Sequence, residues 1–175
     1  MRADQPTPVK YFIGALFSDK ELLERAFEQC VGEIGELGFR SQEFLFNCTD
    51  YYDTEMGGPI QRMFIGIQQI QSPGELARFK NICNTIEDNL RVAGKRKVNL
   101  DIGYLDLHKV ILASAKYNGQ KIYLGDGIYA DPTLVFESGA FQPLANTFPD
   151  FKDGQYNKVF ATLRNCYKSQ LKTAR

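Results

Sequence analysis

The first apolar segments of the chain predict a strand followed by a helix. Residues 9–17 (VKYFIGALF) favour a strand. Ser18 and Glu21 then have the spacing of a capping box at a helix start. From Leu22 to Ile34 apolar residues recur with the helical period, so we expect a helix with one buried face.

The next segments predict a hairpin and a second helix. Apolar residues alternate at 44–48, and a second strand-like run covers 63–70. Residues 57–59 (GGP) lie between these runs and favour a turn, so we expect a long hairpin with a polar, aromatic tip. Residues 72–75 (SPGE) repeat the helix-start pattern, and an apolar stripe follows as far as Leu90.

Residues 97–101 predict a short strand that completes the order β-α-β-β-α-β over residues 9–101. This is the element order of the ferredoxin-like fold. We therefore predict an α+β protein with a ferredoxin-like core and a C-terminal helical and β extension. In that extension we expect a helix within 105–117, strands in KIYLGDGIY and TLVFES, and a last amphipathic helix around 156–167.

The organisation of the chain is predicted to be simple. We expect a flexible N-terminus at residues 1–8 and a single α+β domain at residues 9–175. The reason is that no linker, repeat or low-complexity segment divides the sequence.

Composition narrows the class of protein. The 175 residues are 43% hydrophobic and 24% charged, which is typical of globular proteins. Lys plus Arg and Asp plus Glu number 21 each, so any charged partner must be bound by a local patch. No apolar run approaches the roughly 20 residues of a membrane span, and the first eight residues lack a signal-peptide core. We expect a cytoplasmic protein without a membrane partner.

The cysteines and the single histidine indicate no metal site. Four widely spaced cysteines form no C-x-x-C pair, so we expect four unpaired thiols. Only His108 could join them as a ligand, and it is expected to be an ordinary histidine of the predicted helix. No P-loop motif and no G-x-S-x-G motif is present, and Gly125-Asp126-Gly127 lacks the rest of a dinucleotide fingerprint.

The predicted hairpin tip carries the first cluster of candidate ligand-binding residues. Asp50, Tyr51 and Glu55 lie in a polar segment, and Arg62 follows it. Such carboxylates, phenols and an arginine could bind a cation or orient a polar ligand. The alternative is a solvated turn with weak surface ion pairs, because no Ca²⁺-loop spacing is matched.

A second cluster surrounds the expected end of the strand at 97–101. Its members are Asn99, Asp101, Tyr104, Lys109 and Lys116, joined farther along the chain by Tyr123, Tyr129 and Asp131. Asp101 could accept a proton or hold a metal, and Tyr104 and Lys109 could contact an anion near the predicted helix start. The alternative is a helix cap with half-buried tyrosines and solvated lysines. In the predicted fold the hairpin tip and the end of this strand lie at opposite ends of the sheet, so we expect two separate clusters.

An RNA-binding role has weaker sequence support. Residues 11–16 (YFIGAL) are loosely similar to the first-strand motif of RNA-recognition folds, and a basic cluster occupies 91–97. Residues 63–67 (MFIGI) match the partner motif poorly, and aromatic residues of a central strand are more often core. We therefore expect RNA not to be the partner.

Three segments together resemble an uncharacterised prokaryotic family known only as a domain of unknown function. They are TDYYDTEMG, KVNLDIGYLDLHKVILASAK and KIYLGDGIYAD. Members are often labelled GTP-binding proteins by automatic transfer, and the resemblance implies that label. Because the sequence lacks a P-loop, we expect any affinity for GTP to be weak and not to follow P-loop geometry. The positions covered by the resemblance include Asp50, Tyr51, Tyr52, Glu55, Arg62, Asn99, Asp101, Gly103, Tyr104 and Lys109.

The leading hypothesis is that the protein binds or acts on a phosphorylated or otherwise anionic small molecule. Arg62, Tyr104 and Lys109 would contact the anion, and the carboxylates of both clusters would bind a cation or act as acid or base. The alternative is a noncatalytic module that binds protein or RNA through an exposed sheet face or edge. The sequence identifies no cofactor, catalytic residue or oligomeric state.

Overall fold

The computed structural model describes residues 2 and 4–173, and all of its strands belong to one antiparallel sheet. The prediction of an α+β protein is confirmed. Residues 4–8 carry no helix or strand, while Met1, Ala3 and residues 174–175 lie outside the described residues. The elements are β1 (Val9–Phe17), α1 (Lys20–Glu33), β2 (Leu37–Arg40), β3 (Phe44–Leu45), α2 (Asp53–Met56), β4 (Gln61–Gln71), η1 (Pro73–Glu75), α3 (Leu76–Asn89), β5 (Val98–Leu105), β6 (Lys109–Ser114), β7 (Ile122–Gly125), β8 (Ile128–Glu137), β9 (Ala140–Pro143), α4 (Pro149–Lys152) and α5 (Asn157–Thr173).

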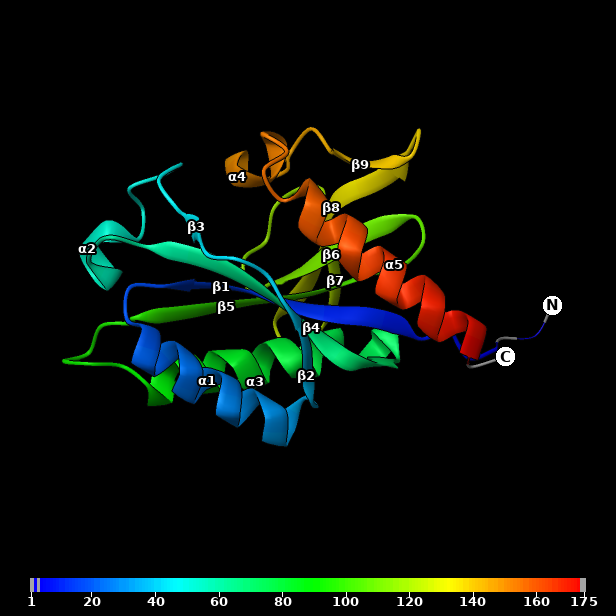
Figure 1. Ribbon diagram of the computed structural model, residues 1–175. Coiled ribbons are helices and arrows are strands. Elements are labelled where there is room, and N and C mark those ends of the chain that lie inside the picture. The colour runs from blue at the N-terminus through cyan, green and yellow to red at the C-terminus, as the bar shows by residue number, and fades with distance from the viewer. Residues whose placement is uncertain (1, 3, 174–175) are drawn as a thin grey trace.

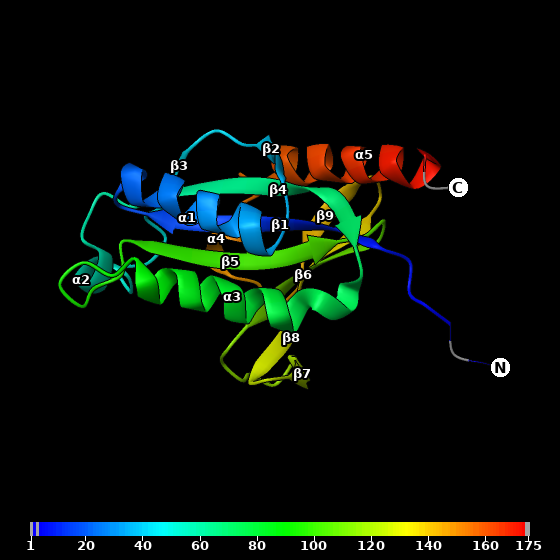
Figure 2. The ribbon, with the colours of Figure 1, turned by 90° about the horizontal axis from the view of Figure 1, so that it is seen from below.

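Helices cover both faces of the sheet (Figures 1 and 2). The strand order is β2-β4-β1-β5-β6-β8-β7, with β3 paired to β4 and β9 paired to β8. Helices α1 and α3 lie side by side on one face, and α5 crosses the other face near α4. No helix among the described residues is long and apolar enough to span a membrane.

Strand β1 forms the centre of the core and is buried along its whole length. Tyr11 and Ile13 belong to the apolar cluster that contains the buried residues of α1 and α3, whereas Phe12 packs with the residues of α5. The hydroxyl of Tyr11 donates to the carbonyl of Ser72. The aromatic residues of β1 are therefore core residues and form no open surface on which RNA bases could stack.

The structure changes several predicted boundaries. The N-cap of α1 is Asp19, whose side chain accepts from the Leu22 amide, one position after the predicted Ser18. The hairpin partner of β4 is mainly β2, because the predicted strand at 44–48 shortens to β3 and residues 46–60 form a loop that contains α2.

The helix predicted within 105–117 is wrong, because this segment forms a turn followed by β6. Asp106 stabilises the turn by accepting hydrogen bonds from the amides of His108 and Lys109. The residues of 110–113 (VILA) are then all buried. A short apolar run of this kind fits a buried strand as well as a buried helix, so its periodicity could not identify it.

The sheet opens between β5 and β6. These strands pair only at Gly103, Tyr104 and Leu105 of β5. Before Gly103, the backbone of β5 forms hydrogen bonds with side chains of α3 instead of with β6. The Leu100 amide donates to Glu87 Oε1 at 2.8 Å, and Lys80 Nζ donates to the Leu100 carbonyl at 2.8 Å. Two helix side chains thus satisfy backbone groups that a neighbouring strand would otherwise pair.

Gly103 lies where the paired part of β5 and β6 begins, and it has no room for a side chain. A Cβ atom there would lie 2.5 Å from the Ile111 carbonyl oxygen and 3.0 Å from Phe12 Cζ. We predict that Gly103→Ala lowers the free energy of unfolding by about 1–3 kcal/mol, the usual cost of overpacking. Urea unfolding followed by circular dichroism measures this loss. Gly119→Ala is the control, because nothing lies within 4 Å of its added Cβ; an equal loss in both variants contradicts the prediction.

Candidate functional site

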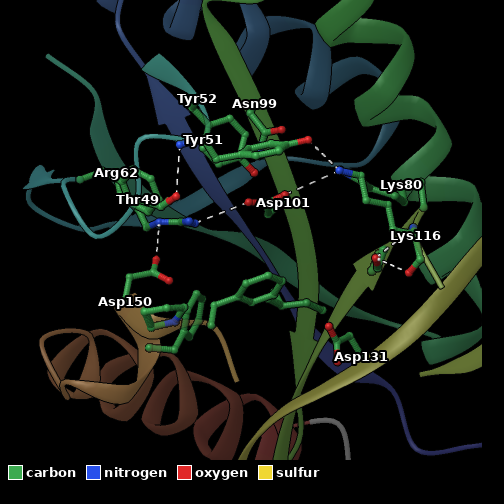
Figure 3. A pocket seen from close by; sticks show the side chains of 18 of the residues that line it. Thr49, Tyr51, Tyr52, Arg62, Lys80, Asn99, Asp101, Lys116, Asp131 and Asp150 are labelled. Atoms are coloured by element: carbon green, nitrogen blue, oxygen red, sulfur yellow. Dashed lines mark hydrogen bonds and ion pairs between the residues drawn. The ribbon is translucent and has the colours of Figure 1, made fainter. Parts of the chain in front are cut away.

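A cavity of about 520 Å³ lies where β5 and β6 separate (Figure 3). Strands β4 and β5 supply one side, and α3 supplies another. The end of β6 with the segment that follows it, β8, the segment before α2 and the segment around α4 complete the lining. Most of the residues that line it have polar or charged groups: Cys48, Thr49, Tyr51, Tyr52, Arg62, Lys80, Asn84, Glu87, Arg96, Asn99, Asp101, Ser114, Lys116, Lys121, Asp131 and Asp150.

Arg62 is a buried cation of this cavity, with only 5% of its surface exposed. It alternates along β4 with Met63, which faces α1 and α3, so its side chain lies on the opposite face of the sheet. Gly14 of β1 leaves space for the guanidinium, since a Cβ atom there would lie 3.1 Å from Arg62 Nη1. The centroids of four aromatic rings lie 5.2–6.0 Å from the guanidinium carbon of Arg62, and these rings belong to Phe46, Phe64, Phe151 and Tyr156.

Two carboxylates flank Arg62. Asp150 Oδ2 lies 3.1 Å from Arg62 Nε, and Asp101 Oδ2 lies 3.6 Å from Nη1. Figure 3 shows Asp101 between Arg62 and Lys80, and its other oxygen is 3.9 Å from Lys80 Nζ. A buried arginine requires such partners, because burial removes its hydration.

From Lys80 the alternation of charges continues to the surface. Glu87 lies 3.8 Å from Lys80 Nζ and 2.9 Å from Arg96 Nη1. Arg96 also donates two hydrogen bonds of 2.8 Å to the carboxylate of Glu55, which lies 3.5 Å from Arg91. This chain of alternating charges connects Asp150, Arg62, Asp101, Lys80, Glu87, Arg96, Glu55 and Arg91.

The carboxylates of this chain differ in their proton affinity. Burial raises the pKa of Glu87 and of Asp150 above the usual range, because removal from water disfavours the charged form. The hydrogen bonds from Arg96 lower the pKa of Glu55, which lies nearer the surface. Glu87 and Asp150 therefore hold their protons to higher pH than Glu55 does.

Two buried side chains of the cavity keep donors without a hydrogen-bond partner. Among the described residues, these atoms are Arg62 Nε and Asn99 Nδ2. Arg62 Nε still has an ion-pair partner, Asp150 Oδ2 at 3.1 Å, whereas Asn99 Nδ2 has none. The Asn99 amide is oriented by Arg96, whose Nη1 donates to Asn99 Oδ1 at 3.0 Å, so Nδ2 is the free end. Arg62 and Asn99 lie on either side of β1, both opposite Leu16 in the strand register. Unsatisfied buried donors are uncommon and call for an acceptor.

Lysines on the other side of the cavity have different partners. Lys121 Nζ donates to Ser114 Oγ at 2.8 Å and lies 3.3 Å from Asp131 Oδ2. Lys116 Nζ donates to the phenol oxygen of Tyr51 at 2.8 Å, and this hydrogen bond lowers the pKa of Tyr51. Within the described part of the chain, Lys116 has no carboxylate partner.

The expectation that Asp101 lies far from the hairpin cluster is wrong. The strand that was predicted to end at Asp101 continues to Leu105, so Asp101 lies nearer the start of β5 and beside Arg62. Tyr104 lies farther along β5 and packs on Tyr11 with ring centroids 5.8 Å apart.

The remaining predicted residues divide between the cavity and its surroundings. Tyr51 lines the cavity, whereas Asp50 is exposed and Glu55 belongs to the outer part of the charge chain. Lys109 pairs with Asp106 in the turn before β6. Tyr104 and Lys109 therefore lie outside the cavity lining.

Sequence reasoning missed several cavity residues. Lys80 and Glu87 are seven positions apart in α3, so they lie on one side of the helix, and both are buried. Asp150 is a buried acid in a segment without a chemical motif. The available signal was a charged pair at helical spacing beside the apolar stripe of α3.

A family described as a domain of unknown function, DUF4416, matches residues 7–167. The chain belongs to this family. The match includes every residue that lines the cavity, and it confirms the resemblance carried by the three sequence segments. No curated protein and no solved structure matches the chain. The DUF4416 description assigns no reaction, so the geometry of the cavity is the basis for a functional proposal.

The raised pKa of Asp150 predicts a pH-dependent effect of Asp150→Asn. The folded protein keeps this proton at higher pH than the unfolded chain does. Wild-type stability from this group is therefore fully present below the unfolded pKa, about 3.9, and decreases as the pH rises. An asparagine side chain does not titrate, so the Asp150→Asn variant does not lose stability in this way as the pH rises.

Accordingly, the thermal midpoint of Asp150→Asn minus that of the wild type should increase between about pH 4 and pH 7. Thermal unfolding across this range gives the difference. Asp126→Asn, in an exposed turn, is the matched control for a lost negative charge. A difference that decreases with pH would show that Arg62 lowers the pKa of Asp150 more than burial raises it.

Proposed function

We propose that the cavity binds a small molecule through a phosphate or carboxylate group. The observation that carries this proposal is the buried donor Asn99 Nδ2, which has no partner, together with the buried guanidinium of Arg62, whose Nε forms an ion pair but no hydrogen bond. Both atoms donate hydrogen bonds, so a ligand would have to supply acceptors. An oxyanion supplies several acceptors and suits the planar guanidinium group of arginine.

The charges of the cavity also favour an anion over a cation. Its lining contains the cations Arg62, Lys80, Arg96, Lys116 and Lys121 and the carboxylates Glu87, Asp101, Asp131 and Asp150. Each carboxylate already lies within 4 Å of a lysine or arginine. A metal ion would have to displace these cations, whereas an oxyanion adds a partner for Lys116, which has no carboxylate partner among the described residues.

We also propose that β2-β4-β1-β5 with α1 and α3 is a ferredoxin-like unit. In support of this, β1 and β5 are neighbours in the middle of the sheet. The connection from β1 to β2 passes through α1 and the connection from β4 to β5 through α3, and both helices lie on the same face. The extension from β6 to α4 then provides the second half of the cavity lining. The binding site would belong to the unit and its extension together.

An interaction module remains a second proposal, and the edge of the sheet supports it. Strand β7 is the last strand in the order, and its residues Ile122, Tyr123 and Leu124 are all exposed. An edge strand of this kind can pair with a strand of another chain. Ile122→Lys would abolish such pairing and leave anion binding unchanged, so the two proposals can be tested separately.

We predict that Asn99→Asp weakens anion binding about tenfold or more. The change keeps the oxygen that accepts from Arg96 but replaces the free donor by a negatively charged acceptor. Binding of inorganic phosphate and acetate is measured by calorimetry at constant ionic strength, with GTP titrated with and without Mg²⁺ as a further ligand.

The matched control is Asn165→Asp, which adds the same charge at an exposed position of α5. It should bind these anions as the wild type does. The proposal is rejected if the wild type binds none of the small anions, or if Asn99→Asp retains wild-type affinity while its circular dichroism spectrum is unchanged.

A further inference from the structure

The cavity combines its polar groups with aromatic side chains. Five aromatic residues line it: Phe46, Tyr51, Tyr52, Phe148 and Phe151. Phe46 and Phe151 are buried in the structure, where their rings lie near the guanidinium of Arg62. Tyr51 and Phe148 differ from them, because 62% and 47% of their surfaces are exposed.

Tyr51 and Phe148 come from distant segments that meet at this cavity. Tyr51 precedes α2, and Phe148 is the residue before α4. Large apolar surface left in water is unfavourable by roughly 25 cal/mol for each Å², and exposed apolar groups that gather at a concavity often mark a ligand site. Two exposed rings at one cavity are therefore a feature that the packing of the core does not explain.

Contacts around Tyr51 hold its ring in a defined orientation. Lys116 Nζ lies over the ring at 4.9 Å from the centroid and donates to the phenol oxygen. The ring of Tyr52 meets it edge to face, with centroids 4.9 Å apart. A ring that is already oriented loses little conformational entropy when a ligand binds against it.

The polar donors and the exposed aromatic rings lie at different depths in the cavity. The buried donors that form no hydrogen bond belong to Arg62 and Asn99, each with 5% of its surface exposed, whereas the exposed rings of Tyr51 and Phe148 lie toward the solvent. The volume of about 520 Å³ falls within the range of small-molecule sites and is larger than a bare phosphate or acetate requires. A complete ligand would therefore reach from the buried donors to the exposed rings.

We infer that the ligand is an oxyanion attached to a flat aromatic ring, such as an aryl phosphate or aryl carboxylate. This inference rests on the proposed anion binding. The oxyanion accepts hydrogen bonds from Arg62 and Asn99, and the ring packs against Tyr51 and Phe148. Lys116 gives the outer part of the site a positive charge. This charge attracts both the electron-rich face of the ligand's ring and its negatively charged oxyanion.

Matched ligands test the ring directly. Phenyl phosphate and cyclohexyl phosphate carry the same charge and the same number of carbon atoms, but only the first is flat and aromatic. We expect calorimetry to show that wild-type protein binds phenyl phosphate about tenfold more tightly, since two aromatic contacts each contribute a few-fold in affinity. Inorganic phosphate provides the affinity of the anion site alone.

Three variants locate the preference on the protein. Phe148→Leu and Tyr51→Leu keep an apolar side chain but lose the ring, so each should reduce the preference for phenyl phosphate severalfold. Phe148→Leu should also leave the affinity for inorganic phosphate unchanged, whereas Tyr51→Leu removes the hydrogen-bond partner of Lys116 and is judged by the preference alone. Tyr117→Leu is the control, because Tyr117 is 72% exposed and lies outside the cavity lining. It should keep the full preference.

The outcomes separate this inference from the proposed function. If phosphate binds but phenyl and cyclohexyl phosphate bind equally, the aromatic ligand is rejected and the anion site stands. If Phe148→Leu and Tyr51→Leu retain the preference, or if Phe148→Leu loses affinity for inorganic phosphate to the same degree, the rings do not form a separate contact and the inference is also rejected. If no anion binds at all, both proposals fail.

Discussion

The arrangement of the site depends on how the edge of β5 is satisfied at Leu100. Its amide and carbonyl form hydrogen bonds with Glu87 and Lys80 of α3, where a strand would otherwise pair. Buried backbone groups must have partners, so these two side chains allow β6 to separate from β5 without leaving them unpaired. The cavity is the space that this separation leaves.

Placing Glu87 and Lys80 at this edge creates the need for further charges. A buried ion without a compensating partner is strongly destabilising. In the chain of alternating charges, each acidic or basic side chain lies beside one of opposite charge. Replacing buried ion pairs by apolar residues is often neutral or stabilising. Stability alone therefore does not account for this chain of alternating charges. The proposed anion site, which would present Arg62 to a ligand, would give such an arrangement a function.

Local patterns predicted the parts of the fold that depend on local interactions. The apolar stripes gave α1 and α3, and the runs of β-forming residues gave β1 and β4, because each pattern matches the geometry of its own element. The pattern failed at 110–113, where β6 is buried on both faces and shows no alternation. It also ended β5 too early, which misplaced Asp101 relative to Arg62.

The candidate site was less predictable, because its residues are brought together by pairing and packing over long separations. Arg62, Asp101 and Asp150 are widely spaced along the chain, and only the register of β4, β1 and β5 together with the position of α4 makes them neighbours. One signal was nevertheless local. In β5 the buried residues Val98, Leu100 and Ile102 alternate with Asn99 and Asp101. A central strand whose second face is polar cannot pack that face into an apolar core, so such alternation in the middle of a sheet indicates a polar cavity.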